Sequence, residues 1–541
     1  MSLAVLRGEP TAAQLFLDQR LRDAAQAAAG AGAGAGAVTL PHLLYHCMLS
    51  RPNNVHMING VSGESFTNEQ LLHRAIPLAR ALSARGASGT AIMCVMRNHE
   101  RLVALYYAAL LAGAAPLLLD PHCTQRELAH FLPLVRPRLV LCDADRRDVV
   151  RAALVLGGDL TDRDLITDDQ LDQFTAGHHG DLEHFQPAAV AEDARAVMLP
   201  TSGSTGLAKA AEITHSALVR QLPSLWSHDA RFPRPTERAL VTSTAQWMTF
   251  TNMLTTCPVY EVTLVLTPDR SLPTVLRIME TYKPTWMLLS PASAADVAAA
   301  APPALRCLRR ALLTGAAPPP AALRGLQRAA PSAQVLNSYG MTEAQGFVAH
   351  ADSDTPLGSI GKIYNIFKYK LVDEDEKEVA LGEKGELYLW SDCIIKRYVN
   401  NEEAYKESVA AGGWWRTGDL FTEDGRGNLH FVARKKFWFK HLNYQISPEE
   451  LEQVIGSVPG VREAAVAGCA RGAAAAVVAA DGRRLRRADV HRAVNEAVSE
   501  YKRLHGGIAF VTSLPRTHTG KLDRAACAAL LQQLVDSGQC C

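Results

Sequence analysis

Short apolar runs that alternate with amphipathic stretches constrain the fold of this chain more than any other feature. Residues 68–85 and 126–135 carry apolar side chains at helical spacing, whereas the runs between such stretches are only four or five residues long. The runs lie at 91–95, 115–119, 139–142, 239–242, 263–267, 286–289 and 311–314. A run that is apolar at every position is typical of a strand buried on both faces, so the alternation predicts an α/β fold with parallel sheets.

The pattern changes twice towards the C-terminus. From about 355 to 432, polar and apolar residues alternate between frequent turn signals, which predicts antiparallel sheet or a small β-barrel appended to the α/β body. From about 435, a helix opening at Ser447-Pro448, a strand at 464–468 and a helix at 488–501 predict a small α+β unit.

A chain of 541 residues is too long for one hydrophobic core, so we expect more than one domain. A variable N-terminal segment, 1–40, contains an Ala/Gly repeat at 28–37 that we expect to be mobile or frayed. An N-terminal domain at 41–433 and a C-terminal domain at 434–541 follow. The last residues, which end in Cys540-Cys541, are expected to form a short flexible tail.

Composition excludes several classes of protein. Lys and Arg number 56 against 55 Asp and Glu, so the net charge of +1 gives no reason to expect nucleic acid or an anionic membrane as partner. The charge-free run at 102–119 is divided by Gly113 and Pro116, which favours a buried helix and a core strand over a membrane span. The 11 cysteines have no metal-like spacing, and the start of the chain lacks a secretory signal. We therefore expect reduced thiols and an intracellular protein, cytoplasmic by default.

One loop of small and hydroxylated residues ends in a lysine. Its residues are Thr201, Ser202, Gly203, Ser204, Thr205, Gly206, Leu207, Ala208 and Lys209. Such a loop turns several N–H groups toward one point, and the hydroxyls and Lys209 add further donors, so the expected ligand is a nucleotide polyphosphate. The spacing is not that of the P-loop GxxxxGK[ST], because neither Ser nor Thr follows Lys209. An ordinary Ser/Gly connector is the alternative.

Further motifs follow this loop in a definite order. The segment Gly315-Ala316-Ala317 closes a predicted strand and leaves room for a flat ligand against the backbone. The segment Ser338-Tyr339-Gly340-Met341-Thr342-Glu343 combines an aromatic face for stacking with a hydroxyl and a carboxylate for a hard cation such as Mg²⁺. Asp419 follows a glycine turn and is suited to accept two ribose hydroxyls, and Lys521 lies on a predicted turn. Taken singly, Asp419 fits an ordinary Asx turn as well as a site, whereas Glu343 is more typical of a solvated loop carboxylate and Lys521 of a surface lysine. Their joint order argues for a site.

These motifs resemble those of the adenylate-forming superfamily of acyl-CoA synthetases, coumarate–CoA ligases and beetle luciferases, from about residue 55 to about 530. The resemblance implies that the loop at 201–209 holds the ATP phosphates and that Tyr339 stacks on adenine. It assigns the phosphates and Mg²⁺ to Thr342 and Glu343, and the ribose to Asp419 and Arg434. Lys521 is then the lysine of the adenylation step, and Lys440 serves the second half-reaction.

The resemblance also implies the reaction. A carboxylate attacks the α-phosphorus of ATP, and because both partners are anionic, Mg²⁺, the loop donors and Lys521 must neutralise charge without consuming the nucleophile. The acyl-AMP then transfers its acyl group to the thiol of CoA. Between the steps the small C-terminal domain is expected to rotate about a hinge near 432–436. The expected substrates are a fatty or aromatic acid, ATP and CoA, bound by a monomer.

The chain departs from the family pattern at several positions. Ala208 and Ala210 flank Lys209 where proline and glycine are usual, and no histidine lies between His228 and His350, where relatives carry one near the acyl pocket. Trp247 in that segment is either a wall of a reshaped pocket or a core aromatic. Lys396-Arg397 precedes Tyr398 where glycine is usual.

Two further departures lie near the predicted hinge and thiol channel. Ala433 replaces the aspartate that usually precedes Arg434, and Asn443 replaces a glycine beside the thiol channel. Asn tolerates a left-handed backbone, but its side chain would crowd a pantetheine arm. The adenylation residues are therefore nearly complete, and the thioester step carries most of the changes.

Three functions remain open from the sequence. The leading hypothesis is an acyl- or aryl-CoA ligase; a luciferase-like adenylating oxidase is the second. The third is a degenerate member that binds a nucleotide or an acyl ligand without turnover. The chain ends Ser-Gly-Gln-Cys-Cys rather than Ser-Lys-Leu, so a peroxisomal address is not expected.

Overall fold

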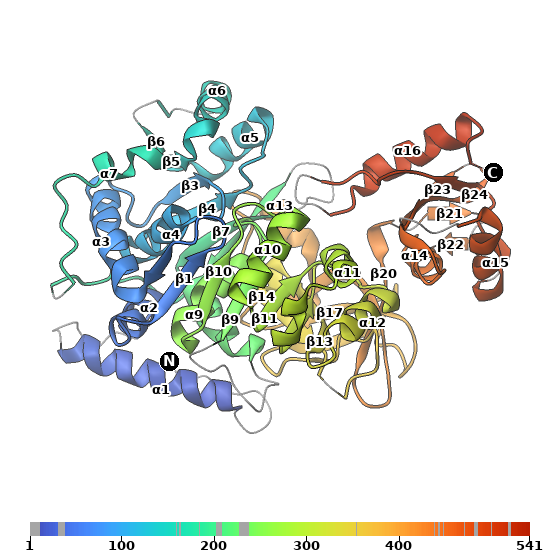
Figure 1. The fold of residues 1–541 in the computed structure, drawn as a ribbon, viewed down its shortest axis with the longest axis horizontal. Helices are drawn as coiled ribbons and strands as arrows, with labels where there is room; N and C mark the ends of the chain where they lie inside the picture. The colour runs from blue at the N-terminus through green and yellow to red at the C-terminus, as the bar shows by residue number, and fades with distance from the viewer. Residues whose placement is uncertain are drawn as a thin grey trace.

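A computed structural model shows α/β layers, an antiparallel sheet and a separate C-terminal domain, as the sequence predicts (Figure 1). The structure describes residues 11–30, 38–157, 160–161, 164–182, 184–201, 208–226, 237–352, 354–437, 439–441, 444–446, 448–469, 471–480, 485–498, 500–517 and 521–540. The elements at the C-terminal end lie together at one side of the molecule, away from the first α/β layers (Figure 1).

The first sheet has six strands in the order β6-β5-β3-β4-β7-β8, parallel except for β8. Its predicted strands β3, β4 and β5 are buried at every position, as their uniform apolar runs require. The strands are β3 (Ala91–Val95), β4 (Ala115–Leu119), β5 (Leu139–Cys142), β6 (Leu165–Thr167), β7 (Arg195–Thr201) and β8 (Lys209–Thr214). The associated helices are α3 (Asn68–Ala84), α4 (Glu100–Ala112), α5 (Gln125–Val135), α6 (Arg147–Gly157) and α7 (Leu171–Phe174).

The apolar run at 102–119 forms helix α4 and strand β4, as predicted. Every residue of α4 from Leu102 to Ala112 is buried, which explains the absence of charge without a membrane. The helix ends at Gly113, whose φ of 71° is a left-handed conformation that favours glycine. None of the helices in the described ranges is both long and apolar enough to cross a membrane.

The second sheet has nine strands in the order β15-β14-β13-β12-β11-β9-β10-β1-β2, with a parallel centre and antiparallel edges. Its strands are β1 (Val55–Asn59), β2 (Ser65–Thr67), β9 (Arg238–Val241), β10 (Thr263–Leu266), β11 (Trp286–Leu289), β12 (Arg310–Leu313), β13 (Gln334–Met341), β14 (Gly346–His350) and β15 (Lys362–Ile363). The helices between them are α8 (His215–Gln221), α9 (Met248–Tyr260), α10 (Leu272–Tyr282), α11 (Pro291–Ala300) and α12 (Pro320–Ala329).

The N-terminal helices pack on this body. Helix α1 (Ala12–Gly30) lies beside α2 (Leu40–Leu49), with Leu17 fully buried and Arg20 paired with Glu261. The hydroxyl of Tyr260 on α9 donates to the carbonyl of Ala13 at 3.2 Å. Of the repeat at 28–37, the first three residues end α1, and residues 31–37 lie outside the described ranges.

The predicted antiparallel region forms an open sheet in the order β16-β17-β19-β18, with β20 paired to β19. Its elements are β16 (Lys368–Val372), β17 (Gly385–Trp390), α13 (Glu402–Ser408), β18 (Val409–Ala410), β19 (Trp414–Glu423) and β20 (Leu429–Arg434). The register pairs Asp419 on β19 with Arg434 on β20, so two predicted ribose-binding residues become neighbours across the ladder.

The C-terminal domain is α+β. Its elements are β21 (Phe439–His441), β22 (Tyr444–Ile446), α14 (Pro448–Gly456), β23 (Val461–Cys469), β24 (Gly472–Ala479), α15 (Arg487–Ala497), β25 (Gly507–Phe510) and α16 (Arg524–Asp536). Helix α14 begins at Pro448 as predicted, whereas the helix predicted to reach Tyr501 already ends at Ala497. Cys540 is buried and its N–H donates to the carbonyl of Leu534, so the chain up to Cys540 packs on α16 rather than forming a free tail.

Candidate functional site

The β13–β14 hairpin places Tyr339 where the second α/β layer meets the antiparallel sheet. Tyr339 O–H donates to Asp419 Oδ2 at 2.7 Å, across 80 residues of sequence. A Cβ added to Gly340 would lie 2.7 Å from the carbonyl oxygen of Gly346, so a glycine is required where the two strands cross. Burial raises the pKa of the Tyr339 hydroxyl, and the Asp419 carboxylate raises it further, which keeps the phenol neutral.

Asp419 and Arg434 form a two-point ion pair at the same place. Arg434 Nε donates to Oδ1 at 2.7 Å, and its terminal nitrogen Nη2 donates to Oδ2 at 3.1 Å. Asp419 is 2% exposed, and its N–H donates to the Thr417 hydroxyl at 3.1 Å. The Asp419 charge raises the pKa of Arg434, so the guanidinium stays charged beside the carboxylate.

Glu343 lies at a second junction, with Tyr398 and Lys209. Tyr398 O–H donates to Glu343 Oε1 at 2.9 Å, and Lys209 Nζ lies 4.2 Å from the centre of the Tyr398 ring. Burial raises the pKa of Tyr398, and the negative charge of Glu343 raises it further. Tyr398 is a neutral donor, so it orients the Glu343 carboxylate without adding a charge of its own, and an oxygen ligand of this kind suits a hard cation.

The ends of the predicted phosphate loop meet this junction. Thr201 and Lys209 are partners in the antiparallel register of β7 and β8, and Ala208 accepts a hydrogen bond from His130 Nε2 at 2.8 Å. Ser202, Gly203, Ser204, Thr205 and Gly206 lie outside the described residues. Ala210 is fully buried in β8, so the methyl that replaces a usual glycine packs in the core.

Lys521 reaches the N-terminal body from the C-terminal domain. Its Nζ lies 4.2 Å from the centre of the Trp247 ring, which immediately precedes α9. Desolvation by surrounding protein lowers the pKa of Lys521 to about 8; the Arg434 charge also lowers it, whereas Glu343 and Asp419 raise it. The side chain stays exposed along the cleft, so water screens part of this effect.

The remaining predicted residues lie around these junctions or outside the described side chains. Gly315, Ala316 and Ala317 are exposed directly after β12, with Gly315 at a φ of 89°. Ser338 is buried on β13, and Thr342 and Glu343 form the short turn after it. Lys440 lies on β21, paired in register with Gln445 on β22, but its side chain is not described, and Asn443 lies outside the described residues.

Sequence reasoning missed the role of Tyr398 and of the pair Glu386–Lys435. Glu386 is 4% exposed, accepts from Gly418 N–H at 3.2 Å and pairs with Lys435 Nζ at 2.9 Å, so it fixes the turn before Asp419. Arg397 donates to the buried Glu212 at 3.1 Å, which gives the unusual basic residue before Tyr398 a structural partner. For the pairs Glu386–Lys435 and Glu212–Arg397, the sequence signal was a glutamate within an apolar strand, because a buried carboxylate needs a charged partner.

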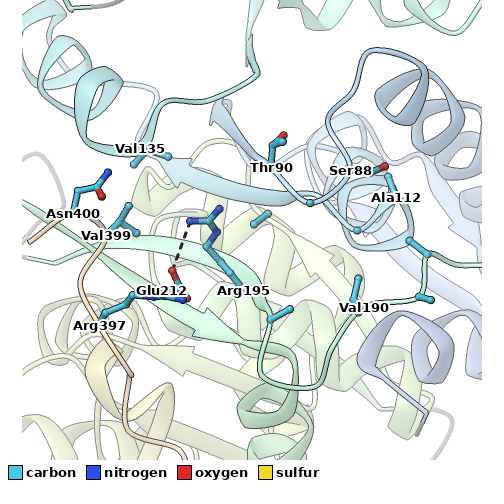
Figure 2. A pocket seen from close by; sticks show the side chains of 16 residues that line it. Ser88, Thr90, Ala112, Val135, Val190, Arg195, Glu212, Arg397, Val399 and Asn400 are labelled. Carbon is cyan, nitrogen blue, oxygen red and sulfur yellow. Dashed lines mark hydrogen bonds and ion pairs between the residues drawn. The ribbon is translucent and has the colours of Figure 1, made fainter. Parts of the chain in front are cut away.

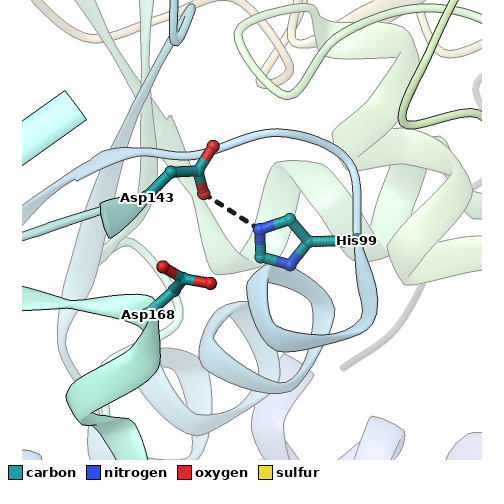
Figure 3. Close-up of side chains that lie close together, drawn as sticks. All are labelled: His99, Asp143 and Asp168. Atoms are coloured by element: carbon teal, nitrogen blue, oxygen red, sulfur yellow. Dashed lines mark hydrogen bonds and ion pairs between the residues drawn. The ribbon is translucent and has the colours of Figure 1, made fainter. Parts of the chain in front are cut away.

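A His–Asp cluster stands apart from this site. His99, Asp143 and Asp168 follow strands of the first sheet at its carboxyl edge, and His99 Nε2 lies 2.9 Å from Asp143 Oδ1 (Figure 3). Arg97 donates to Asp143 at 2.8 Å and Arg101 to Asp168 at 3.1 Å. These two guanidiniums already balance both carboxylates, so we assign no metal to the cluster.

A cavity of about 560 Å³ also lies apart from the predicted residues. Figure 2 shows that it is lined mainly by small side chains, with Arg195 facing Glu212. None of the predicted site residues that the structure describes lines it. The candidate site is therefore defined by the junctions around Asp419, Glu343 and Lys521, not by cavity size.

This arrangement of two α/β sheets, an antiparallel sheet and a C-terminal domain whose lysine enters the cleft is that of adenylate-forming enzymes. The AMP-binding enzyme family model matches residues 46–399, and the AMP-binding enzyme C-terminal domain model matches residues 450–521. The chain belongs to the AMP-binding enzyme family.

Individual relatives agree with this assignment. The chain is 29% identical over 504 residues to luciferin 4-monooxygenase of Photuris pensylvanica, covering 87% of this chain and 90% of the relative. It is 28% identical over 487 residues to 4-coumarate–CoA ligase-like 9 of Arabidopsis thaliana, covering 87% and 85%.

Solved structures establish the fold. The anthranilate CoA ligase AuaEII in complex with anthranoyl-AMP matches with a TM-score of 0.83 at 21% identity, over 92% of this chain and 98% of that chain. ATP-bound MatB from Rhodopseudomonas palustris matches with a TM-score of 0.81 at 23% identity, over 92% and 100%.

Proposed function

We propose that this protein activates a carboxylic acid with ATP to form an acyl-AMP and then transfers the acyl group to CoA. The observation that carries the proposal is that Lys521, from the C-terminal domain, meets the N-terminal body at Trp247, where its Nζ lies 4.2 Å from the ring centre. The charges of Glu343, Asp419 and Arg434 also act on its ammonium. Relatives named as 4-coumarate–CoA ligases support acyl transfer to CoA.

In the proposed site, the ribose hydroxyls bind Asp419 and the adenine ring packs on Tyr339. Tyr339 and Arg434 hold the Asp419 carboxylate in one orientation and fill three of its roughly four acceptor positions, so a second ribose hydroxyl would have to take the position of one of these donors. The predicted loop at 201–209, including Lys209, takes the phosphates. Lys521 balances the charge that develops when the carboxylate oxygen attacks the α-phosphorus and pyrophosphate leaves.

Glu343 and Thr342, adjacent in one short turn, would hold Mg²⁺ in this proposal. The donor set is of oxygen atoms, as Mg²⁺ prefers, and Tyr398 fixes the Glu343 carboxylate by a neutral hydrogen bond. When bound, the ion would offset polyphosphate charge. This chain's own contribution is to orient that carboxylate through Tyr398, whose ring centre lies 4.2 Å from Lys209 Nζ.

The second step requires a change of domain orientation in this proposal. We place the domain boundary at Arg434, with residues 41–433 and 434–541 as the two moving parts and the hinge at 432–436. Rotation would withdraw Lys521 and bring Lys440 to the acyl-AMP, as in the family pattern.

The test of function follows pyrophosphate, AMP and acyl-CoA from the pure protein with Mg-ATP, CoA and a panel of fatty and aromatic acids. We expect all three products with at least one acid, and Lys521→Ala should lower pyrophosphate release by about 10²-fold or more. Lys377→Ala, at an exposed lysine on another surface, should leave it unchanged. Absence of pyrophosphate with every acid would contradict the proposal and favour the non-catalytic alternative.

A luciferase-like oxidase is the second candidate, because luciferin 4-monooxygenases are among the relatives. Light emission with Mg-ATP, oxygen and a beetle luciferin would support it. Acyl-AMP without acyl-CoA or light would instead indicate that the thioester step is blocked, as expected if Asn443 obstructs the thiol.

A further inference from the structure

Trp247 is held firmly in place although it lies at the edge of the cleft. Its N–H donates to the carbonyl of Thr244 at 3.1 Å, and its own carbonyl accepts from Phe250 N–H at 3.0 Å. The neighbouring Gln246 is buried and donates to the fully buried Asp120 at 3.0 Å. Hydrogen bonds therefore fix the backbone that carries the indole, both before and after Trp247.

Lys521 is also anchored on its side of the cleft. Its carbonyl accepts from Thr517 N–H at 2.8 Å, and the flanking residues Arg516 and Leu522 pair as an antiparallel bridge. Two fixed backbones thus present an ammonium to an indole face at 4.2 Å, within the range of a cation–π contact.

The charged groups that act on Lys521 are already engaged with other partners. Asp419 accepts from Arg434 and Tyr339, and Glu343 accepts from Tyr398. The positive charge of Arg434 lowers the pKa of Lys521 and so disfavours its ammonium form. The face of the Trp247 ring carries no net charge and has a fixed backbone, and it attracts the Lys521 ammonium by a cation–π contact.

Resting on the proposed function, we propose that Trp247 is a positioning residue, whose indole face holds the Lys521 ammonium in the orientation used for acid activation. The contact joins the two domains in the first half-reaction and is broken when the C-terminal domain rotates for the second. An indole takes up no proton in the working pH range, so the contact does not depend on the ionisation of Trp247. The chain has no histidine between His228 and His350, and in this segment a tryptophan contacts the lysine instead.

The experiment compares Trp247→Leu with Trp247→Phe and Trp247→Tyr, using an acid that the wild-type enzyme activates. A cation–π contact at a partly exposed site corresponds to about a 2- to 5-fold effect. We expect Trp247→Leu to lower the kcat of pyrophosphate release by that factor, and the two aromatic variants to retain most of it. In a Lys521→Ala background, Trp247→Leu should have no further effect.

Two kinetic outcomes would overturn the inference. If Trp247→Leu raises the KM for the acid and leaves kcat unchanged, Trp247 is a wall of the acid pocket. If the aromatic variants lose as much kcat as the leucine variant, the ring shape and not its face is what matters.

A second measurement keeps the contact testable without turnover. Amine labelling with N-hydroxysuccinimide acetate, read by mass spectrometry, reports the reactivity of Lys521 directly. We expect faster labelling of Lys521 in Trp247→Leu than in wild type or Trp247→Phe, with Lys377 as the internal control. Equal labelling in all three proteins would overturn the contact, whereas absent pyrophosphate with altered labelling would contradict only the proposed function.

Discussion

At the scale of single residues, charge pairing decides how the candidate site is built. Within the described part of the chain, Asp419 accepts from a phenol and a guanidinium, whereas Glu343 accepts from a phenol. The first carboxylate is thereby held by a charged donor and the second is oriented by a neutral one. This difference is consistent with the proposed roles, ribose hydroxyls at Asp419 and a cation at Glu343.

Replacing Asp419 by Asn tests this pairing. The amide cannot accept both guanidinium hydrogen bonds, so we expect the KM for ATP to rise about 10- to 100-fold, because hydrogen bonds to charged groups contribute about 1.5–3 kcal/mol each. Kinetics at saturating acid measures this. Asp375 is exposed in the turn that follows β16 in the same sheet, so Asp375→Asn should leave the KM for ATP unchanged. An unchanged KM in Asp419→Asn would remove this carboxylate from nucleotide binding.

At the scale of elements, the β13–β14 hairpin carries Tyr339 and leads to Glu343. Its two strands approach so closely at Gly340 that a Cβ would meet a backbone oxygen, which cannot rotate away as a side chain would. The close packing of the two strands at Gly340 therefore determines where Tyr339 and Glu343 lie.

Gly340→Ala should lower the free energy of unfolding by about 1–3 kcal/mol, the usual cost of overpacking, and should also reduce pyrophosphate release. Gly325→Ala is the matched control. Gly325 lies within α12 and an added Cβ has its nearest neighbour at 3.9 Å, so alanine should be neutral or stabilise the helix by up to about 1 kcal/mol. Denaturant unfolding measures both; equal stability of the two variants would contradict the close approach.

At the scale of the whole molecule, a buried polar contact links the first layers. His56 on β1 lies 2.8 Å from Asn68 Oδ1 and 2.9 Å from the Tyr107 hydroxyl, which in turn donates to Leu254 on α9. Burial lowers the pKa of His56 to about 4. The unfolded chain binds a proton near pH 6.5 and the folded chain only near pH 4, so stability falls as the pH decreases through that window.

This histidine should account for about 3 kcal/mol of the lost stability, because its pKa is 6.5 in the unfolded chain and about 4 in the folded chain. We expect His56→Gln to have a shallower fall in unfolding free energy between pH 6.5 and pH 4 than wild type. Chemical denaturation at several pH values measures the slope. His184→Gln, at an exposed position, should keep the wild-type slope, and an unchanged slope in His56→Gln would assign the acid sensitivity to other groups.

The predicted elements differ in how closely they were located. The strands β3, β4, β5 and β11 match their predicted runs, because uniform burial leaves a continuous apolar signal. The strand β24 was not predicted: its run of alanines at 473–476 favours helix by intrinsic propensity, and only pairing with β23 and β25 makes it a strand. The helix α16 was also not assigned.

The sequence by itself determined the α/β class, the order of the motifs and the chemistry of the side chains, because these depend on residue type and spacing. The tertiary structure alone decided which of those side chains meet. Tyr398 lies 55 residues from Glu343, and Lys521 comes from another domain to the face of Trp247. Such contacts depend on strand register and domain packing, which no local pattern encodes. For the same reason the sequence left open whether Trp247 is a core aromatic or a wall of the site. In the folded protein, Trp247 contacts Lys521, the lysine of the proposed first step.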